Sequence, residues 1–136
     1  MSHDSESCVM VVDDEPDLCE TVQIVLQLEG YDVITSADGA EALARLRGGF
    51  HPCLILLDIM MPRMNGLQFR EEQMRDPALR EIPVFVLTGG GDAVLSKAAA
   101  LGLKWLRKPV QLELLLGVVE RFCRPSGGAR ACAPPR

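Results

Sequence analysis

Short apolar segments alternate with helix-like patterns five times along the chain, and this alternation constrains the fold more than any other feature. Strands that are covered on both faces need no polar alternation, so each apolar run predicts a buried strand. The predicted strands cover residues 8–12, 31–36, 53–58, 83–88 and 104–107. The predicted helices cover about residues 16–30, 39–49, 66–74, 92–101 and 110–122. Alternation at this length implies right-handed crossovers, so we expect an α/β protein with a doubly wound parallel sheet.

The length and composition of the chain are typical of one compact domain. The chain is 48% hydrophobic, which is enough for a real core. Its 136 residues are too few for two domains of ordinary size. We predict a polar N-terminal extension over residues 1–7 and the domain over residues 8–123. The remaining residues, 124–136, are rich in Gly, Pro and Ala, and we predict a disordered C-terminal tail there.

Charge and hydropathy narrow the possible partners and the location. The net charge of -5 disfavours non-specific binding to nucleic acid and to anionic membranes. A DNA-binding role would need an additional domain. The N-terminus has no apolar core of signal-peptide length, and no apolar run is long enough to cross a membrane. We therefore expect a cytoplasmic protein without direct nucleic-acid or membrane contacts.

The cysteine pattern suggests neither a disulfide framework nor a zinc site. The number of cysteines is odd, and none of them has C-x-x-C spacing. Reduced, structural thiols are the expected state. The residues concerned are Cys8, Cys19, Cys53, Cys123 and Cys132.

Polar residues follow four of the five predicted strands. In an open α/β sheet the functional crevice lies beyond the carboxyl ends of the strands, so these side chains should meet at one edge. Each alone has an ordinary structural explanation, such as a helix N-terminus or a solvated loop charge. Together, several crowded carboxylates repel one another and need a hard divalent cation and an ammonium as counter-charges. The residues are Asp13, Asp14 and Glu15 after the first strand, Asp58 after the third, Thr88 after the fourth and Lys108 after the fifth.

The ordered motifs VVDDEP, LILLDIMMPRMNG, VFVLTGG and LRKP resemble the receiver domain of two-component response regulators, over about residues 8–123. The resemblance implies a flavodoxin-like (βα)5 fold with a five-stranded parallel sheet in the order 2-1-3-4-5. It also implies a regulatory phosphoacceptor, which catalyses only its own phosphorylation and dephosphorylation and is no enzyme otherwise. The implied partners are a sensor histidine kinase or histidine phosphotransfer protein, and an unidentified downstream protein.

The resemblance assigns roles at the phosphorylation site by position. Asp58 would accept the phosphoryl group, Lys108 would bind it and Thr88 would hydrogen-bond it. Pro109 would follow a cis peptide bond. Thr88 and Trp105 would form the switch, with Trp105 at a position that usually holds a Tyr or Phe.

The cofactor implied by the resemblance is Mg²⁺. Asp14 and Asp58 would ligate it through their side chains, Asp13 through water, and Met60 through its backbone carbonyl. The chemistry of these groups agrees, because Mg²⁺ prefers a few carboxylates, waters and phosphate oxygens in octahedral array. Phosphoryl transfer mostly requires positioning and neutralised charge.

The segment between Thr88 and Lys108 departs from the family pattern. It is shorter than is common in the family and begins with Gly89, Gly90 and Gly91. Because of this shortening, the sequence alone does not settle whether the fourth helix forms. Ordering three glycines has a high entropy cost, so we expect this loop to be mobile before phosphorylation.

Three other functions can be compared with these residues. A phosphohydrolase of the haloacid dehalogenase type also has an Asp after an apolar strand. That family has a second Asp two positions later, where this chain has Met60. Without that residue, protonation of the leaving group has no obvious agent. A docking module that works without phosphorylation and a receiver fragment of a hybrid kinase stay open. Failure to bind Mg²⁺ or a phosphoryl analogue would favour the docking module.

Overall fold

The computed structural model describes residues 4–125 and contains a single parallel sheet with helices on both faces. A short 3-10 helix, Asp4–Ser7, precedes the first strand. The strands are β1 (Cys8–Val12), β2 (Asp32–Ser36), β3 (Leu54–Asp58), β4 (Val84–Thr88) and β5 (Lys104–Arg107). The helices are α1 (Pro16–Leu28), α2 (Gly39–Arg47), α3 (Gly66–Arg75), α4 (Asp92–Ala100) and α5 (Leu112–Phe122). Each predicted strand and helix is confirmed, including α4 after the shortened glycine segment.

The sheet order β2-β1-β3-β4-β5 confirms the predicted doubly wound topology. All four neighbouring pairs are parallel. The register pairs Val12 with Leu57, so Asp13 and Asp58 follow at the same level of the sheet. Thr88 pairs with Arg107, so Lys108 comes next at the end of β5. The four predicted motifs therefore end at one edge.

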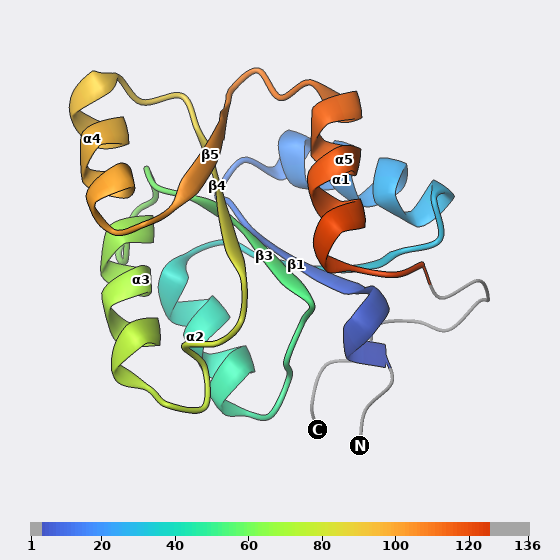
Figure 1. Ribbon diagram of the computed structural model, residues 1–136, viewed down its shortest axis with the longest axis horizontal. Coiled ribbons are helices and arrows are strands. Elements are labelled where there is room, and N and C mark those ends of the chain that lie inside the picture. The colour runs from blue at the N-terminus through green and yellow to red at the C-terminus, as the bar shows by residue number, and fades with distance from the viewer. Residues whose placement is uncertain (1–3, 126–136) are drawn as a thin grey trace.

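Two helical layers bury the two faces of the sheet (Figure 1). On one face, α1 and α5 pack against alternate residues of the central strands, such as Val9 and Leu56. On the other face, α2 and α3 cover the intervening residues, such as Met10 and Leu57, and α4 covers Val86. Every residue of β1 and β3 is buried, which explains why both strands are apolar up to Asp58, the last residue of β3.

The helix ends carry residues that favour starting or stopping a helix. Pro16 lies in the first turn of α1, and Gly30, just beyond its end, has a positive φ of 93° that favours glycine. Asp38 caps α2 by accepting a hydrogen bond from the Glu41 amide. Asn65 begins α3 with a reciprocal capping box. Glu15 is the residue before α1, but its side chain makes no cap hydrogen bond.

The expectation of reduced cysteines is wrong for Cys8, Cys53 and Cys123, all of which are disulfide-bonded. Cys53, just before β3, forms a disulfide with Cys123, just after α5. The two residues are 70 positions apart in sequence, and only the packing of α5 beside β3 brings them together. Cys19 on α1 is buried and free, as expected.

Two other sequence predictions concern the ends of the chain and its hydropathy. Of the predicted C-terminal tail, only residues 124 and 125 are described, and residues 126–136 lie outside the described part. Within residues 4–125, no helix is both long and apolar enough to cross a membrane.

Candidate functional site

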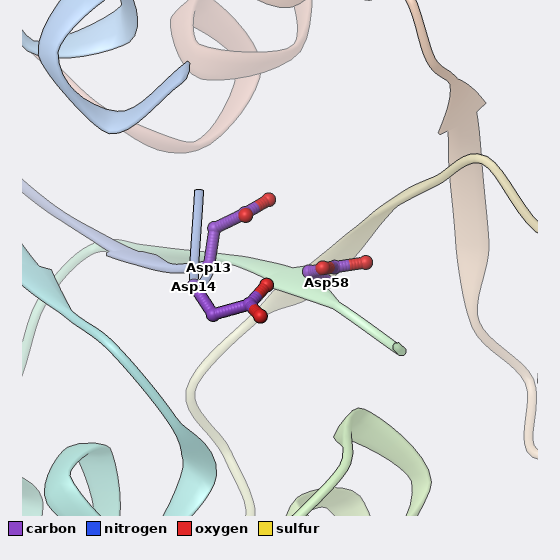
Figure 2. Close-up of side chains that lie close together, drawn as sticks. All are labelled: Asp13, Asp14 and Asp58. Carbon is purple, nitrogen blue, oxygen red and sulfur yellow. The ribbon is translucent and has the colours of Figure 1, made fainter. Parts of the chain in front are cut away.

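Three carboxylates gather at the carboxyl ends of β1 and β3 (Figure 2). Asp13, Asp14 and Asp58 each offer an oxygen, and these atoms lie within 4.8 Å of one another. Asp13 and Asp58 are almost fully buried because both continue buried strands, whereas Asp14 is exposed. The hard oxygen donors and their close spacing fit a cation such as Mg²⁺, which prefers carboxylates and water.

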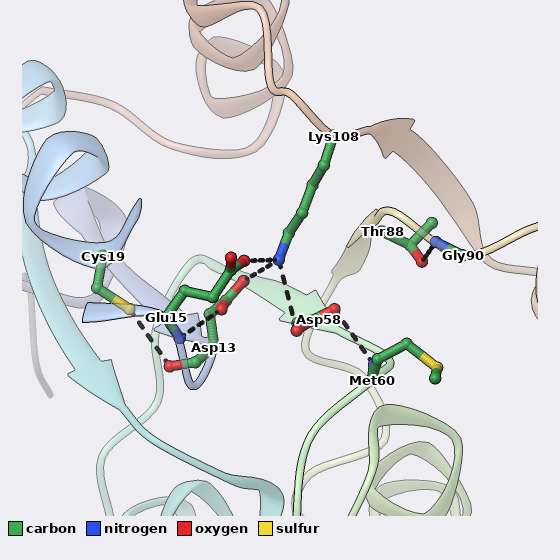
Figure 3. A network of polar contacts seen from close by, with 8 residues as sticks. All are labelled: Asp13, Glu15, Cys19, Asp58, Met60, Thr88, Gly90 and Lys108. Carbon is green, nitrogen blue, oxygen red and sulfur yellow. Dashed lines mark hydrogen bonds and ion pairs between the residues drawn. The ribbon is translucent and has the colours of Figure 1, made fainter. Parts of the chain in front are cut away.

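The ammonium of Lys108 lies among these acids and forms three ion pairs (Figure 3). Its Nζ lies 2.8 Å from Asp13 Oδ2, 3.5 Å from Asp58 Oδ2 and 2.5 Å from Glu15 Oε1. The peptide bond between Lys108 and Pro109 is cis, as the family resemblance implied. The backbone amide of Lys108 donates to the Thr88 carbonyl at 2.8 Å, which attaches this turn to the end of β4.

Burial and crowding shift the pKa values of these groups. Desolvation, followed by the charge of Asp13, raises the pKa of Asp58 to about 6 against the opposing effect of Lys108. Burial likewise raises the pKa of Asp13, although Lys108 acts to lower it. Burial lowers the pKa of Lys108, but its hydrogen bonds to Asp13 and Glu15 outweigh this, and the net shift is upward. The ammonium therefore stays protonated, whereas Asp58 carries an incompletely compensated charge.

Thr88 lies at the same sheet edge but outside the ion-pair network (Figure 3). It is fully buried, and its hydroxyl oxygen accepts a hydrogen bond from the Gly90 amide at 2.9 Å. Met60 lies close to Asp58 through its backbone, because its amide donates to Asp58 Oδ1 at 3.2 Å. Met60 as a residue is 60% exposed.

Trp105 lies on β5, half-buried against the apolar cluster beneath α4. Its neighbours there include Val86, Ala98 and Leu103. The indole is therefore already packed against the layer that the predicted switch would involve, and its movement stays a prediction.

An open pocket of about 350 Å³ lies above Asp58. It is lined by acids, by Lys108 and by the backbone of the loop after β4. The lining residues are Asp14, Glu15, Asp58, Met60, Gly89, Gly90 and Lys108. A phosphoryl group on Asp58 would therefore meet the ammonium and the loop glycines.

Two contacts at the site were missed by the sequence predictions. Glu15 was expected at this edge of the sheet but without a specific partner, and its carboxylate pairs with Lys108. Arg63, in the loop after β3, has a positive φ of 62° and donates from Nε to Asp38 Oδ2 at 2.8 Å. The third consecutive acid in VVDDEP was a signal for the first contact, whereas no local pattern predicts the second.

The buried thiol of Cys19 borders the acid cluster from α1. Its Sγ lies 3.4 Å from the Asp13 carbonyl oxygen. Burial, followed by the charge of Asp13, raises the pKa of this thiol to about 11. The group is therefore a neutral packing thiol at pH 7.

The sequence matches the family described as response regulator receiver domain over residues 9–120. Protein PilG of Pseudomonas aeruginosa is 36% identical over 115 residues, which cover 82% of this chain and 84% of PilG. The probable transcriptional regulatory protein TcrX of Mycobacterium tuberculosis is 36% identical over 88% of this chain and 50% of TcrX. The chain thus spans most of PilG but half or less of the transcriptional regulators it matches.

Solved structures give the same result. The chemotaxis response regulator CheY4 of Vibrio cholerae superimposes with a TM-score of 0.76 at 32% identity, covering 85% of this chain and 98% of CheY4. A response regulator receiver protein from Pseudomonas putida gives a TM-score of 0.79 at 25% identity, over 85% and 97% of the two chains. The predicted flavodoxin-like fold is confirmed, and the family match covers most of the chain. The chain therefore belongs to the receiver domain family of response regulators in two-component signalling.

Proposed function

We propose that Asp58 accepts a phosphoryl group from a phosphohistidine of a sensor histidine kinase or histidine phosphotransfer protein. One observation carries the proposal: Asp58 lies beside Asp13, Asp14 and the Lys108 ammonium at the end of β3. Phosphoryl transfer depends on positioning and on neutralised charge, and this cluster offers both. Membership of the receiver family supports the same role.

The acid cluster would hold Mg²⁺ as cofactor. Asp14 and Asp58 would ligate the ion directly, Asp13 through water, and Met60 through its backbone carbonyl. When bound, the cation supplies charge that offsets the repulsion between carboxylate and phosphate oxygens. The fit of the donor set supports this choice, because all the oxygens are hard ligands.

Asp58 acts as the nucleophile in this proposal. One of its oxygens forms a bond to phosphorus while the phosphorus–nitrogen bond of the donor breaks. With a pKa of about 6, Asp58 is mainly a carboxylate at pH 7. Lys108, now 3.5 Å from Asp58 Oδ2, then pairs with an oxygen of the acyl phosphate.

The phosphoryl group would change the surface through Thr88 and Trp105. The Thr88 hydroxyl would turn from the Gly90 amide, its present partner, towards the phosphate. The space beside the glycine loop would then admit the indole of Trp105. The expected output surface is formed by α4, β5 and α5, and it would bind an unidentified downstream protein.

We propose that the receiver domain covers residues 8–123. It would catalyse only its own phosphorylation and dephosphorylation. We also propose that the domain is cytoplasmic and makes no direct contacts with nucleic acid or membranes. A receiver segment of a hybrid kinase is the alternative arrangement, since the chain also matches parts of longer proteins. The complete reading frame decides between the two arrangements.

Mass spectrometry after treatment with acetyl phosphate tests the proposed nucleophile. In the presence of Mg²⁺ one phosphoryl group should be added, and peptide mapping should find it on Asp58. The Asp58→Asn protein and wild type in EDTA should stay unlabelled. Asp92→Asn, which changes an exposed acid on α4, is the matched control and should be labelled like wild type. Labelling of Asp58→Asn, or full labelling in EDTA, would contradict the assignment.

The phosphorylation-independent docking module predicts a different result. In that case a folded protein would bind neither Mg²⁺ nor beryllofluoride, a phosphoryl analogue. The cluster of Asp13, Asp14, Asp58 and Lys108 argues against this function, since a docking surface has no need for three crowded carboxylates. Metal titration followed by beryllofluoride titration distinguishes the two.

A further inference from the structure

The disulfide between Cys53 and Cys123 lies at the end of the sheet opposite the acid cluster. Cys53 precedes β3, whose last residue is Asp58, and its amide donates to the Cys8 carbonyl at 2.9 Å. Cys123 follows the last residue of α5. Their Cα atoms are 5.5 Å apart, within the usual range for a disulfide. The bond therefore joins a central strand to the end of a peripheral helix.

Cys123 attaches the end of α5 to the core beyond Val119. Val119 is buried, but the next three residues, 120–122, are exposed. Among the described residues after Val119, no side chain other than that of Cys123 is buried. The next tether is a backbone hydrogen bond from the Arg124 amide to the Glu6 carbonyl, at 2.7 Å. Opening the disulfide would leave this turn with few contacts.

The two sulfur positions differ in their access to solvent. Cys53 is half-buried, whereas Cys123 is only 4% exposed. A reductant would therefore reach Cys53 first. In the predicted cytoplasmic location, disulfides are usually transient or redox-sensing rather than permanent.

We propose that Cys53 and Cys123 form a reversible oxidation site, opened by a dithiol reductant, whose state sets the order of the last turn of α5. This inference goes beyond the proposed phosphorylation and does not depend on it. The site belongs to the opposite end of β3, and neither cysteine contacts the acid cluster. The chemical partner is any small or protein dithiol that can reach Cys53.

The reaction is ordinary thiol–disulfide exchange. A thiolate of the reductant attacks Cys53 Sγ, a mixed disulfide forms there, and Cys123 leaves as a thiolate that takes up a proton. The second thiolate of the reductant attacks the reductant's first sulfur, which is bonded to Cys53 Sγ in the mixed disulfide. Cys53 then leaves as a thiolate that is protonated in turn. The protein pair gains two electrons and two protons, and the reductant becomes a cyclic disulfide.

Differential alkylation and amide hydrogen exchange of the full chain test the proposal. Dithiothreitol should make Cys53 and Cys123 alkylatable together, and oxidised dithiothreitol should reverse this. In the reduced protein, amides of residues 120–123 should exchange roughly tenfold faster or more, while amides of β3 stay protected. Cys53→Ser should show the fast exchange without reductant. Cys19→Ser, which changes the free thiol on α1, should behave like wild type.

Two results would overturn the inference. One is a pair that stays oxidised at high dithiothreitol concentration in the folded protein, which would make the disulfide a permanent link. The other is a reduced protein with unchanged exchange at residues 120–123, which would mean that the turn does not depend on the bond. A beryllofluoride titration of both states keeps the proposals separate: loss of binding in both would count against phosphorylation at Asp58 and leave the oxidation site unaffected.

Discussion

The two ends of β3 have opposite character. At its carboxyl end, Asp58 is buried beside Asp13, and Lys108 compensates their charges only in part. At its amino end, Cys53 packs against the apolar layer of α1 and α5 and is covalently joined to Cys123. β3 thus has buried charges at its carboxyl end, and apolar packing and a disulfide at its amino end.

The difference shows where stability and function lie in this domain. Buried, incompletely paired carboxylates cost folding free energy, and sites that bind cations or phosphate retain them for that purpose. The cross-link and the apolar layers have no role in the proposed chemistry, and they supply stabilisation that offsets this cost. Changes at the amino end should therefore weaken the fold, whereas removing charge at the carboxyl end should strengthen it.

The largest expected effect is loss of the cross-link. A Cys53→Ala, Cys123→Ala double variant should lower the free energy of unfolding by about 2–4 kcal/mol, because the bond no longer restricts the unfolded chain. Urea denaturation of oxidised proteins measures the difference. Wild type in dithiothreitol, where Cys8 is reduced as well, should lose at least as much, whereas Cys19→Ser should lose less. A double variant as stable as oxidised wild type would remove the contrast between the two ends.

The opposite sign is expected at Asp58. Its pKa is raised to about 6 in the folded protein, so its protonated form favours folding. That contribution is complete below the unfolded pKa of about 4 and is lost as the pH rises through about 6. Asp58→Asn in EDTA should therefore raise the free energy of unfolding at pH 7 by about 1–3 kcal/mol.

The pH dependence provides the control for this prediction. The stability difference between Asp58→Asn and wild type should shrink between pH 7 and pH 4, as wild-type Asp58 becomes protonated. Urea denaturation at several pH values in EDTA measures it. A difference that is independent of pH would show that packing, and not charge, separates the two proteins.

Most of the fold was predictable because each layer of the structure leaves a local signal. Buried strands are apolar along most of their length, and the first turn of α1 carries Pro16. The grouping of Asp13, Asp58 and Lys108 was predictable as well, because parallel strands end at one edge. Their roles came from the order of the motifs rather than from any one residue.

The pairings between distant residues were not predictable. Lys108 and Glu15 are 93 positions apart, and Cys53 and Cys123 are 70 apart. Both pairings depend on how neighbouring elements pack. An odd number of cysteines without a spacing motif does not indicate which of them form a disulfide. Arg63 and Asp38 pair across 25 positions, between two loops. Sequence patterns specify elements, whereas such contacts depend on their assembly.

A smaller effect is expected when the positive charge is removed from the carboxyl end. Lys108 neutralises Asp13 and Asp58 but is not expected to ligate the cation, since the acids supply the ligands. Lys108→Ala should therefore bind Mg²⁺ as well as wild type or up to about tenfold more tightly. Isothermal titration at pH 7 measures this. Abolished metal binding in a folded Lys108→Ala protein would give Lys108 a direct role in the metal site.

The smallest effect concerns Glu15, whose exposed carboxylate competes for Lys108. Its Oε1 lies 2.5 Å from Lys108 Nζ, whereas Asp58 Oδ2 lies 3.5 Å from the same nitrogen. Glu15 is more than half exposed, so the pair contributes only about 0.2–1 kcal/mol. Glu15→Gln should release the ammonium towards a phosphoryl group and tighten beryllofluoride binding in Mg²⁺ by about 1.5- to 5-fold. Fluorescence titration of Trp105 or calorimetry measures the affinity.

Glu20→Gln is the matched control for this last prediction, because it removes an exposed negative charge from α1 without a contact to Lys108. A general change in net charge would affect both variants equally. Release of Lys108 predicts tighter binding for Glu15→Gln alone, and the gain should disappear in a Lys108→Ala background, where no ammonium remains to release. Raising the salt concentration should also reduce the gain, since exposed ion pairs are screened. If Glu15→Gln weakens beryllofluoride binding instead, Glu15 holds the ammonium in its working position, and the carboxyl end of β3 is organised by four acids rather than three.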